Sequence, residues 1–224
     1  MPPATFIREQ QLIEVRGGWF DATTHSYFDA RMQSVPGVTH TLEAAGLVCY
    51  DHIPKAILDH KAEVGTAAHA ASHYYDEGDL DLSSVDDEAM GYLEGWMKFK
   101  RENRMEIHAI EQRGIVIVDG MPYGYTFDRD VTLAGARTLI EIKCTAGIEI
   151  SWGPQTAAYE CALRAIDGKA RRRVAVHLKP AGTYVLLPLS EVKDYQVWKW
   201  ALGLETWKQT KGRGYGYGSA HIGR

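Results

Sequence analysis

A chain of 224 residues is long enough for one large domain, or for one domain with an appendage, because a typical domain spans about 150 residues. Its 45% hydrophobic, 24% charged and 10% aromatic residues are typical of a globular protein and exclude a collagen-like, coiled-coil or wholly disordered chain. Residues 161–224 hold 12 Lys and Arg against 4 Asp and Glu, a net +8, which leaves −12 for residues 1–160. The basic C-terminal third favours a polyanionic partner.

The sequence shows neither a membrane span nor a signal peptide. No apolar run approaches the roughly 18 residues that a span needs, and the first residues lack a basic segment followed by an apolar one. Cys49, Cys144 and Cys161 form no C-x-x-C pair, which is typical of a reducing compartment and argues against a zinc knuckle or an iron–sulfur cluster. We therefore expect a cytoplasmic protein with no membrane partner.

The N-terminal half predicts short strands followed by helices. Apolar residues alternate around the turn signal Gly17-Gly18, and from Thr39 onward their spacing becomes helical. Gly65 predicts a bend in the second helix, and Ser84 and Asp87 have the spacing of a capping box for the third. The expected elements are strands near residues 12–15, 19–20 and 26–28, and helices over residues 39–46, over residues 54–75 and from residue 84 onward.

The C-terminal half predicts a sheet with two further helices. The apolar period changes to two after Asn103, and Asp119-Gly120 and Ala134-Gly135 are turn signals. The expected elements are strands over residues 107–118, 123–133, 138–144, 173–178 and 183–187, with helices over residues 154–166 and 191–208. This order predicts an α/β fold of the α+β type, with a central mixed β-sheet flanked by helices.

The domain organisation follows from the same pattern. We expect a single domain over residues 1–210. It comprises N-terminal β additions over residues 1–34, a core over residues 35–188 and a C-terminal helix over residues 191–210. Residues 211–224 contain five glycines and are expected to form a flexible, basic tail.

Two expected neighbouring strands carry acidic residues that point to a metal site. Glu141 and Lys143 lie on one face of their strand, and antiparallel pairing through the preceding turn brings Asp128 onto that face. Two adjacent carboxylates repel each other unless a cation lies between them, and magnesium is the hard cation that prefers such oxygen ligands. Lys143 would then lie close enough to orient or activate a water. The alternative is a surface Glu141–Lys143 ion pair, with Asp128 solvated or paired with Arg129.

Two helices contribute further polar side chains. His69 lies among small residues that allow close helix packing, and Gln155 and Tyr159 are four residues apart on one helix face. His69 and His73 share a face, so zinc is an alternative, but the glutamate of a zinc-protease motif and an obvious third ligand are absent. Each of these residues also has an ordinary structural explanation, as a satisfied histidine or a solvent-facing polar residue.

The order of these motifs resembles the PD-(D/E)xK nuclease superfamily, and specifically its RecB-like branch, which includes phage exonucleases. The resemblance covers residues 35–159. It is carried by Gly65-x-x-x-His69, then Asp128, then Glu141-x-Lys143 and finally Gln155-x-x-x-Tyr159. It implies a restriction-endonuclease-like core over residues 35–188, with the strands and helices before it as additions.

The resemblance also implies a role for each matching position. His69, Asp128, Glu141 and the main-chain carbonyl of Ile142 would hold one or two Mg²⁺ or Mn²⁺ ions. Lys143 would be the catalytic lysine, acting with Glu141 and Asp128. Gln155 and Tyr159 would contact DNA and support the site, and Glu111 is a further acidic candidate.

The sequence departs from the family pattern in two places. Many members have glycine three residues before the metal-binding aspartate, whereas Tyr125 stands there and the glycine is Gly124, so Asp130 remains an alternative ligand to Asp128. Some members carry an iron–sulfur cluster on four cysteines, and with three this chain is expected to carry none.

The basic run Arg171, Arg172 and Arg173 follows the Gln155 helix directly, and we expect it to bind phosphates, with a solvated loop as the alternative.

These observations predict a metal-dependent DNA nuclease that hydrolyses phosphodiester bonds. The resemblance implies an exonuclease of recombination, repair or phage DNA replication, in the cytoplasm of a bacterial cell or a phage-infected host. DNA is the expected partner, with a single-strand-annealing or recombination protein and a second copy of the chain as further candidates. The alternatives are a catalytically silent DNA-binding module and a nuclease subunit of a larger complex.

Overall fold

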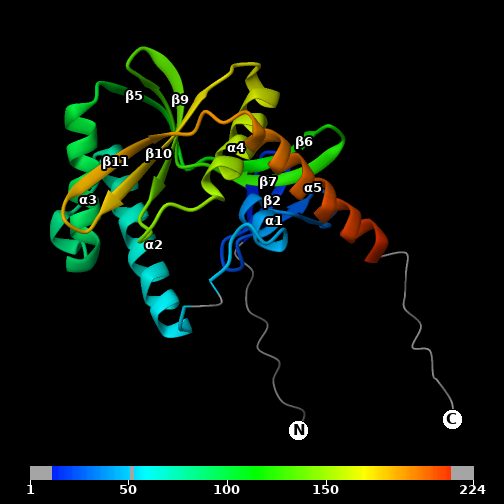
Figure 1. Ribbon diagram of the computed structural model, residues 1–224, viewed down its shortest axis with the longest axis horizontal. Helices are drawn as coiled ribbons and strands as arrows, with labels where there is room; N and C mark the ends of the chain where they lie inside the picture. The colour runs from blue at the N-terminus through cyan, green and yellow to red at the C-terminus, as the bar shows by residue number, and fades with distance from the viewer. Residues whose placement is uncertain (1–11, 51–52, 213–224) are drawn as a thin grey trace, which may run out of the picture.

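The computed structural model describes residues 12–50 and 53–212 (Figure 1). Its N-terminal strands form an antiparallel sheet in the order β1-β2-β3-β4, as the alternation around Gly17-Gly18 predicts. The strands are β1 (Leu12–Val15), β2 (Gly18–Asp21), β3 (Ser26–Asp29) and β4 (Ser34–Val35).

The central sheet has five strands in the order β11-β10-β9-β8-β5. β9 and β10 run parallel because a helix crosses over between them, and the other pairs are antiparallel. The strands are β5 (Met105–Ile110), β8 (Arg129–Leu133), β9 (Ala136–Lys143), β10 (Arg172–Lys179) and β11 (Thr183–Pro188).

Helices cover both faces of this sheet, which confirms the expected α+β fold with a mixed central sheet. On one face, α2 and α3 pack through Ala68 and Trp96 onto Ile140 and Ile142 of β9. On the other face, the helices α1, α4 and α5 share a core with Leu139. The helices are α1 (Val38–Ala44), α2 (Lys55–Glu77), α3 (Asp87–Glu102), α4 (Trp152–Asp167) and α5 (Lys193–Gly212).

Two of the strand predictions are wrong, because the structure divides each of these segments into two strands. Residues 107–118 divide into β5 and β6 (Arg113–Val118), and residues 123–133 divide into β7 (Met121–Thr126) and β8. The first break falls at Glu111, whose backbone is left-handed with φ 42°. The hairpin β6–β7 leaves the central sheet and contacts the N-terminal sheet, where Gly124 lies against the ring of Tyr27 with no room for a Cβ.

Helix boundaries also differ from the prediction. α2 continues as a helix through Gly65. α3 is capped by Asp86, whose carboxylate accepts a hydrogen bond from the Glu88 N–H at 2.8 Å. The capping box expected from Ser84 is therefore wrong, and Ser84 instead ends a short 3-10 helix. α5 runs into the predicted tail as far as Gly212, and residues 213–224 of that tail lie outside the described residues.

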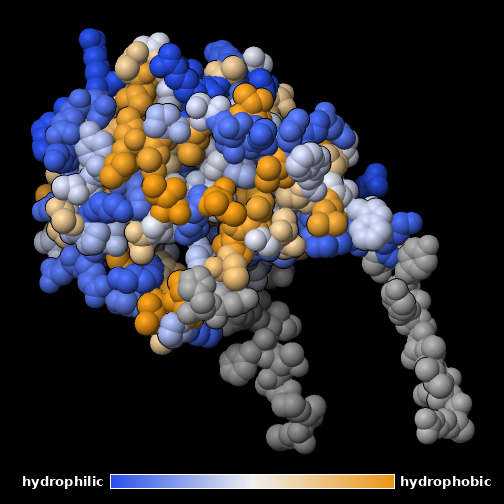
Figure 2. Space-filling model, viewed as in Figure 1, coloured by the Kyte–Doolittle hydropathy of each residue, from blue (hydrophilic) through white to orange (hydrophobic). Residues whose placement is uncertain are grey.

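The surface in Figure 2 is hydrophilic over α3, while hydrophobic side chains cover β10 and β11 and continue across the middle of the same face. Within the described part of the chain, no helix combines the length and the apolar character that crossing a membrane requires.

Two glycines on neighbouring helices provide a test of the packing. A Cβ on Gly91 of α3 would meet the backbone of Pro180 in the β10–β11 turn, whereas a Cβ on Gly65 of α2 would meet nothing within 4 Å. Gly91→Ala is expected to lower the free energy of unfolding by about 1–3 kcal/mol through overpacking. Gly65→Ala is expected to raise it by about 0.5–1 kcal/mol, because alanine loses less backbone entropy in a helix. Urea unfolding measures both, and equal effects of the two variants would contradict this packing.

Candidate active site

The end of β8 brings Asp128 against β9. Arg129 of β8 pairs with Ile140 of β9, so Asp128, one residue before β8, lies beside the next residues of β9. Its Oδ2 accepts a hydrogen bond from the Ile142 N–H at 2.7 Å. We expected Asp128 to lie within a strand, and this is wrong. It lies in the break between β7 and β8, where its carboxylate is free to turn onto β9.

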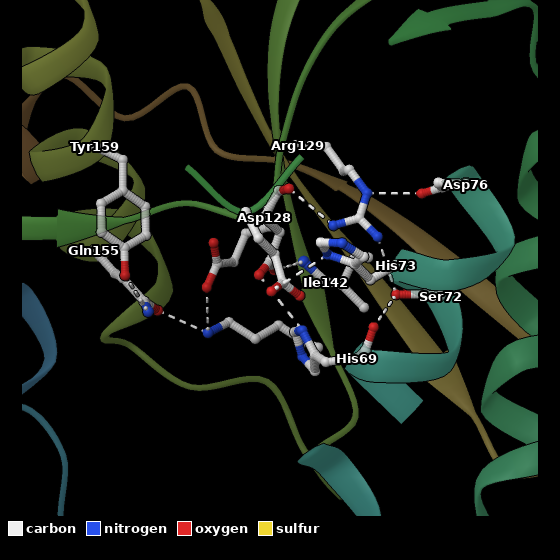
Figure 3. Close-up of polar contacts among 12 residues, drawn as sticks. His69, Ser72, His73, Asp76, Asp128, Arg129, Ile142, Gln155 and Tyr159 are labelled. Carbon is white, nitrogen blue, oxygen red and sulfur yellow. Dashed lines mark hydrogen bonds and ion pairs between the residues drawn. The ribbon is translucent and has the colours of Figure 1, made fainter. Parts of the chain in front are cut away.

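His69 reaches the same place from α2. Its Nδ1 lies 3.4 Å from Asp128 Oδ1 (Figure 3). His69 stands above the sheet because Val64 and Ala68, on the buried side of α2, belong to the core over β9 and β10. The small side chains near His69 therefore set the helix close to the sheet, as the sequence predicted.

A chain of hydrogen bonds joins the remaining motif residues. Lys143 Nζ lies 3.1 Å from Glu141 Oε1 and donates to Gln155 Oε1 at 2.7 Å. Gln155 Nε2 donates in turn to the Tyr159 hydroxyl at 3.1 Å. Figure 3 shows Gln155 and Tyr159 on one helix facing His69 and Asp128 on the other side of the site. The structure thus brings together all four motifs that the sequence singled out.

The electrostatics of the site are dominated by burial and by its two carboxylates. Burial and the nearby Asp128 raise the pKa of Glu141 to about 7, although Lys143 acts in the opposite direction. Burial also acts to raise the pKa of Asp128, but His69, Arg129 and the Ile142 N–H outweigh it, so this pKa is lowered. Burial acts to lower the pKa of His69, yet Asp128 outweighs it and the pKa is raised. The neighbours of Asp128 therefore compensate its negative charge, whereas the neighbours of Glu141 do not offset the cost of burying its charge.

The residues present fit a divalent cation. Glu141 Oε2 is buried and has no hydrogen-bond partner, which marks an oxygen able to accept a ligand. Asp128 supplies carboxylate oxygens beside it. Because the N–H and C=O of a strand residue point to the same edge, the Ile142 carbonyl faces the side from which Asp128 accepts the Ile142 N–H. This set of hard oxygens is the kind that Mg²⁺ prefers, with His69 as a nitrogen donor.

A main-chain carbonyl is needed to complete this set. Among residues 12–50 and 53–212, no three or more His, Cys, Asp or Glu side chains are grouped to hold a metal ion as they stand. The pairing expected of a zinc site on α2 is also absent there: His69 lies against Asp128, whereas the His73 nitrogens lie 3.2 Å from Glu77 and 3.4 Å from Glu111.

A fully buried arginine ties α2 to the site. Arg129 Nε donates to Asp76 at 2.7 Å, its Nη1 donates to the Asp128 carbonyl at 2.8 Å and its Nη2 donates to the Ser72 hydroxyl at 3.2 Å. Ser72 donates in turn to the His69 carbonyl at 2.8 Å. The segment that carries His69 and the strand end that carries Asp128 are therefore fixed to one another. Sequence reasoning missed Ser72 and Asp76, which no local pattern distinguishes.

Asp128 and Asp130 have different partners. The Asp130 carboxylate lies between Arg137, at 2.6 Å, and Arg171, at 2.8 Å, and these two arginines hold its pKa low despite its burial. Asp130 is committed to a buried ion-pair network, whereas Asp128 faces His69. Asp128 is the candidate ligand.

The expected phosphate contacts of the arginine run require correction. Arg171 is 7% exposed and paired with Asp130 and Asp167, and Arg173 is 5% exposed and paired with Asp194. Arg171, directly before β10, and Arg173 within it are both buried, and internal partners hold both guanidinium groups. Arg172 points outward and is exposed, so it alone of the three can meet a phosphate.

A cavity of about 410 Å³ opens beside the site. His69, Asp128 and Tyr159 line it together with Glu111, the further acidic candidate, and Arg113. Residues of the N-terminal sheet, including Phe20 and Tyr27, form another wall of the cavity. The sequence motifs did not predict that this sheet would lie beside the site.

Comparison with known proteins identifies no family. No protein-family model matches the chain, and no curated protein matches it. Among solved structures it is similar to a protein titled "Crystal structure of SSO0001", at 17% identity and a TM-score of 0.32, over 75% of this chain and 84% of that one. A likeness this weak supports no conclusion about fold or activity.

The ion pair beneath the site gives a second prediction. Asp76→Asn removes the charge that balances Arg129, and both side chains are fully buried, so we expect it to lower the free energy of unfolding by about 3–5 kcal/mol. Asp59→Asn removes an exposed pair with Lys55 and is expected to cost less than about 1 kcal/mol. Chemical denaturation measures both, and a small effect of Asp76→Asn would show that the buried pair is not a structural anchor.

Proposed function

We propose that this protein is a metal-dependent DNA nuclease with a PD-(D/E)xK-type site, and that it hydrolyses phosphodiester bonds. One observation carries the proposal: Glu141 has a buried oxygen, Oε2, without a hydrogen-bond partner. Glu141 lies on β9, the strand that also carries Lys143 and whose Ile142 N–H donates to Asp128. The N–H of Ile142 and the His69 ring hold Asp128 in place. Acids and a lysine arranged in this way suit the hydrolysis of a phosphate ester.

The metal site proposed here uses Asp128, Glu141, the Ile142 carbonyl and His69. A bound Mg²⁺ or Mn²⁺ would polarise the scissile phosphate and lower the pKa of a water for in-line attack. The burial of Glu141 keeps bulk water from competing for its oxygens, which strengthens any charge interaction there.

Lys143 would orient the attacking water or donate to a phosphate oxygen. Its ammonium is held between Glu141 Oε1 and Gln155 Oε1, so its position is fixed before substrate arrives. Tyr159 holds Gln155 through its hydroxyl, and burial raises the pKa of Tyr159, which keeps that hydroxyl protonated. Gln155 and Tyr159 act in this proposal as the support of Lys143 and as contacts for DNA.

We further propose that the activity is that of an exonuclease in recombination, repair or phage DNA replication. Such an enzyme would act in the cytoplasm of a bacterial cell or a phage-infected host, beside a single-strand-annealing or recombination protein, or as a homo-oligomer. The choice of an exonuclease rests on the motif resemblance, and the cavity beside the site is where a DNA end would enter.

Metal binding provides a direct test. Wild-type protein is expected to bind Mn²⁺, detected by the loss of free Mn²⁺ signal in electron paramagnetic resonance. Asp128→Asn and Glu141→Gln each remove a charged oxygen donor and are expected to weaken binding at least tenfold. The exposed Asp59→Asn serves as the control and should bind as wild type does. Equal Mn²⁺ affinity in all four proteins would place the metal elsewhere.

Nuclease activity is tested on linear and closed-circular DNA with Mg²⁺, Mn²⁺ or EDTA. We expect metal-dependent loss of linear DNA, reduced by at least about 100-fold in Lys143→Ala, in line with the usual effect of removing one transition-state contact. Cleavage of the closed circle as well would change the assignment to an endonuclease. DNA binding by the wild type without cleavage of any substrate would replace the proposal with a catalytically silent binding module.

A further inference from the structure

α5 presents a stripe of large side chains to solvent. Trp200, Leu204 and Trp207 are 70%, 45% and 57% exposed, and their spacing of four and three residues places them on one side of the helix. α5 runs along the outside of the molecule (Figure 1), and its opposite side, with Trp198 and Leu202, packs into the core. The outward tryptophans are therefore not needed to hold the helix on the fold.

Four lysines surround this Trp stripe. With about 3.6 residues per turn, Lys193 and Lys211 continue the stripe at its two ends, and Lys199 and Lys208 lie on its two sides. All four are exposed. Long flexible cations around an apolar centre are suited to a negatively charged partner.

The carboxylates of α5 do not offset this charge at the outer surface. Asp194 turns inward to pair with Arg173, and Glu205 is 8% exposed, so no described Asp or Glu of α5 is exposed. Acidic neighbours reduce this charge in part: Lys199 lies 2.6 Å from Asp119 in the β6–β7 turn, Lys208 lies 3.8 Å from Glu205, and the exposed Glu191 carboxylate accepts a hydrogen bond from the Lys193 N–H at 3.1 Å. The charge of the stripe and its surround stays positive.

Exposed indole rings with cations around them match the requirements of single-stranded nucleic acid. Unpaired bases stack on aromatic side chains while Lys or Arg follows the phosphates, and the base faces of a duplex are hidden within its own stack. Trp200 and Trp207 are separated by about 10 Å along the helix, so each can take a different base. A second copy of the chain fits less well, since it would bring like-charged lysines together.

We propose that the Trp stripe of α5 binds single-stranded DNA, with unpaired bases stacked on Trp200 and Trp207 and phosphates paired with the surrounding lysines. This deepens the proposed function and rests on it for the choice of DNA, because a nuclease that works from a duplex end leaves one strand unpaired. α5 packs against α4, the helix that carries Gln155 and Tyr159. In this proposal, the domain that cuts one DNA strand at the active site also binds the uncut strand through α5.

The test measures binding of a fluorescein-labelled oligothymidylate and of a duplex of equal length, by fluorescence anisotropy in EDTA. Trp200→Ala combined with Trp207→Ala is expected to weaken binding of the single strand by about tenfold or more and to change duplex binding little. Lys193→Gln is expected to reduce the slope of log affinity against log salt by about 0.7, the value for one phosphate contact on a single strand.

The control is Ile117→Ala, which shortens a side chain that is 66% exposed on the β6–β7 hairpin and should leave binding unchanged. Thermal unfolding shows that the tryptophan variant remains folded. Equal affinity of wild type and the tryptophan variant for the oligothymidylate overturns the proposal. So does a change from dimer to monomer in sedimentation with DNA affinity retained, which would assign the stripe to self-association.

The assay separates this inference from the proposed function. Because EDTA prevents metal-dependent cleavage, strand binding is measured independently of hydrolysis. Binding that depends on the two tryptophans, in a protein that cleaves nothing, would overturn the nuclease and leave the α5 surface assigned. Cleavage together with tryptophan-independent binding would overturn the α5 surface alone.

Discussion

The ion pair between Asp76 and Arg129 is the contact on which the rest of the site depends. Both side chains are fully buried, and removing Asp76 would leave the Arg129 charge uncompensated in the core, whereas Asp76 also pairs with Lys100 of α3. Trp96 of α3 also donates to Asp76, at 3.0 Å, so the pair joins α2, α3 and β8. Arg129 then donates to the carbonyl of Asp128, its neighbour in sequence. The interaction that fixes two helices to the sheet therefore also fixes the position of a candidate metal ligand.

Packing at the site leaves a buried carboxylate oxygen without a hydrogen-bond partner. Folded proteins pair nearly all of their buried polar atoms, and exceptions call for a physical explanation. Glu141 Oε2 is such an exception, although Glu141 Oε1 reaches Lys143. Under the proposed function, the fold stabilises one carboxylate, Asp128, with His69 and a backbone N–H, and leaves Glu141 with an oxygen open to a ligand.

The positive charge of the C-terminal third serves two different purposes. Arg171 and Arg173 look like phosphate-binding residues in sequence, yet they close ion pairs with Asp130 and Asp194 and hold β10 to its neighbours. The lysines of α5, together with Arg164, Lys169 and Arg172, carry positive charge that reaches solvent. A count of basic residues cannot separate these roles, because burial and pairing depend on residues far away in the chain. The same difference in partners separates Asp130, which pairs with two arginines, from Asp128, which faces His69.

The sequence by itself determined the mixed α+β class and most of the order of helices and strands, because periodicity is a local property of the chain. Motif spacing also singled out His69, Asp128, Glu141, Lys143, Gln155 and Tyr159, which the structure brings together. The sequence pattern merged β5 with β6 and β7 with β8, because the breaks arise where the β6–β7 hairpin turns toward the N-terminal sheet. Only the tertiary structure decided which aspartate faces His69, that Arg171 and Arg173 are internal, and that Asp76 and Ser72 support the site. These outcomes depend on contacts between residues far apart in sequence, such as Asp76 with Arg129, and no local pattern encodes the partner of a buried charge.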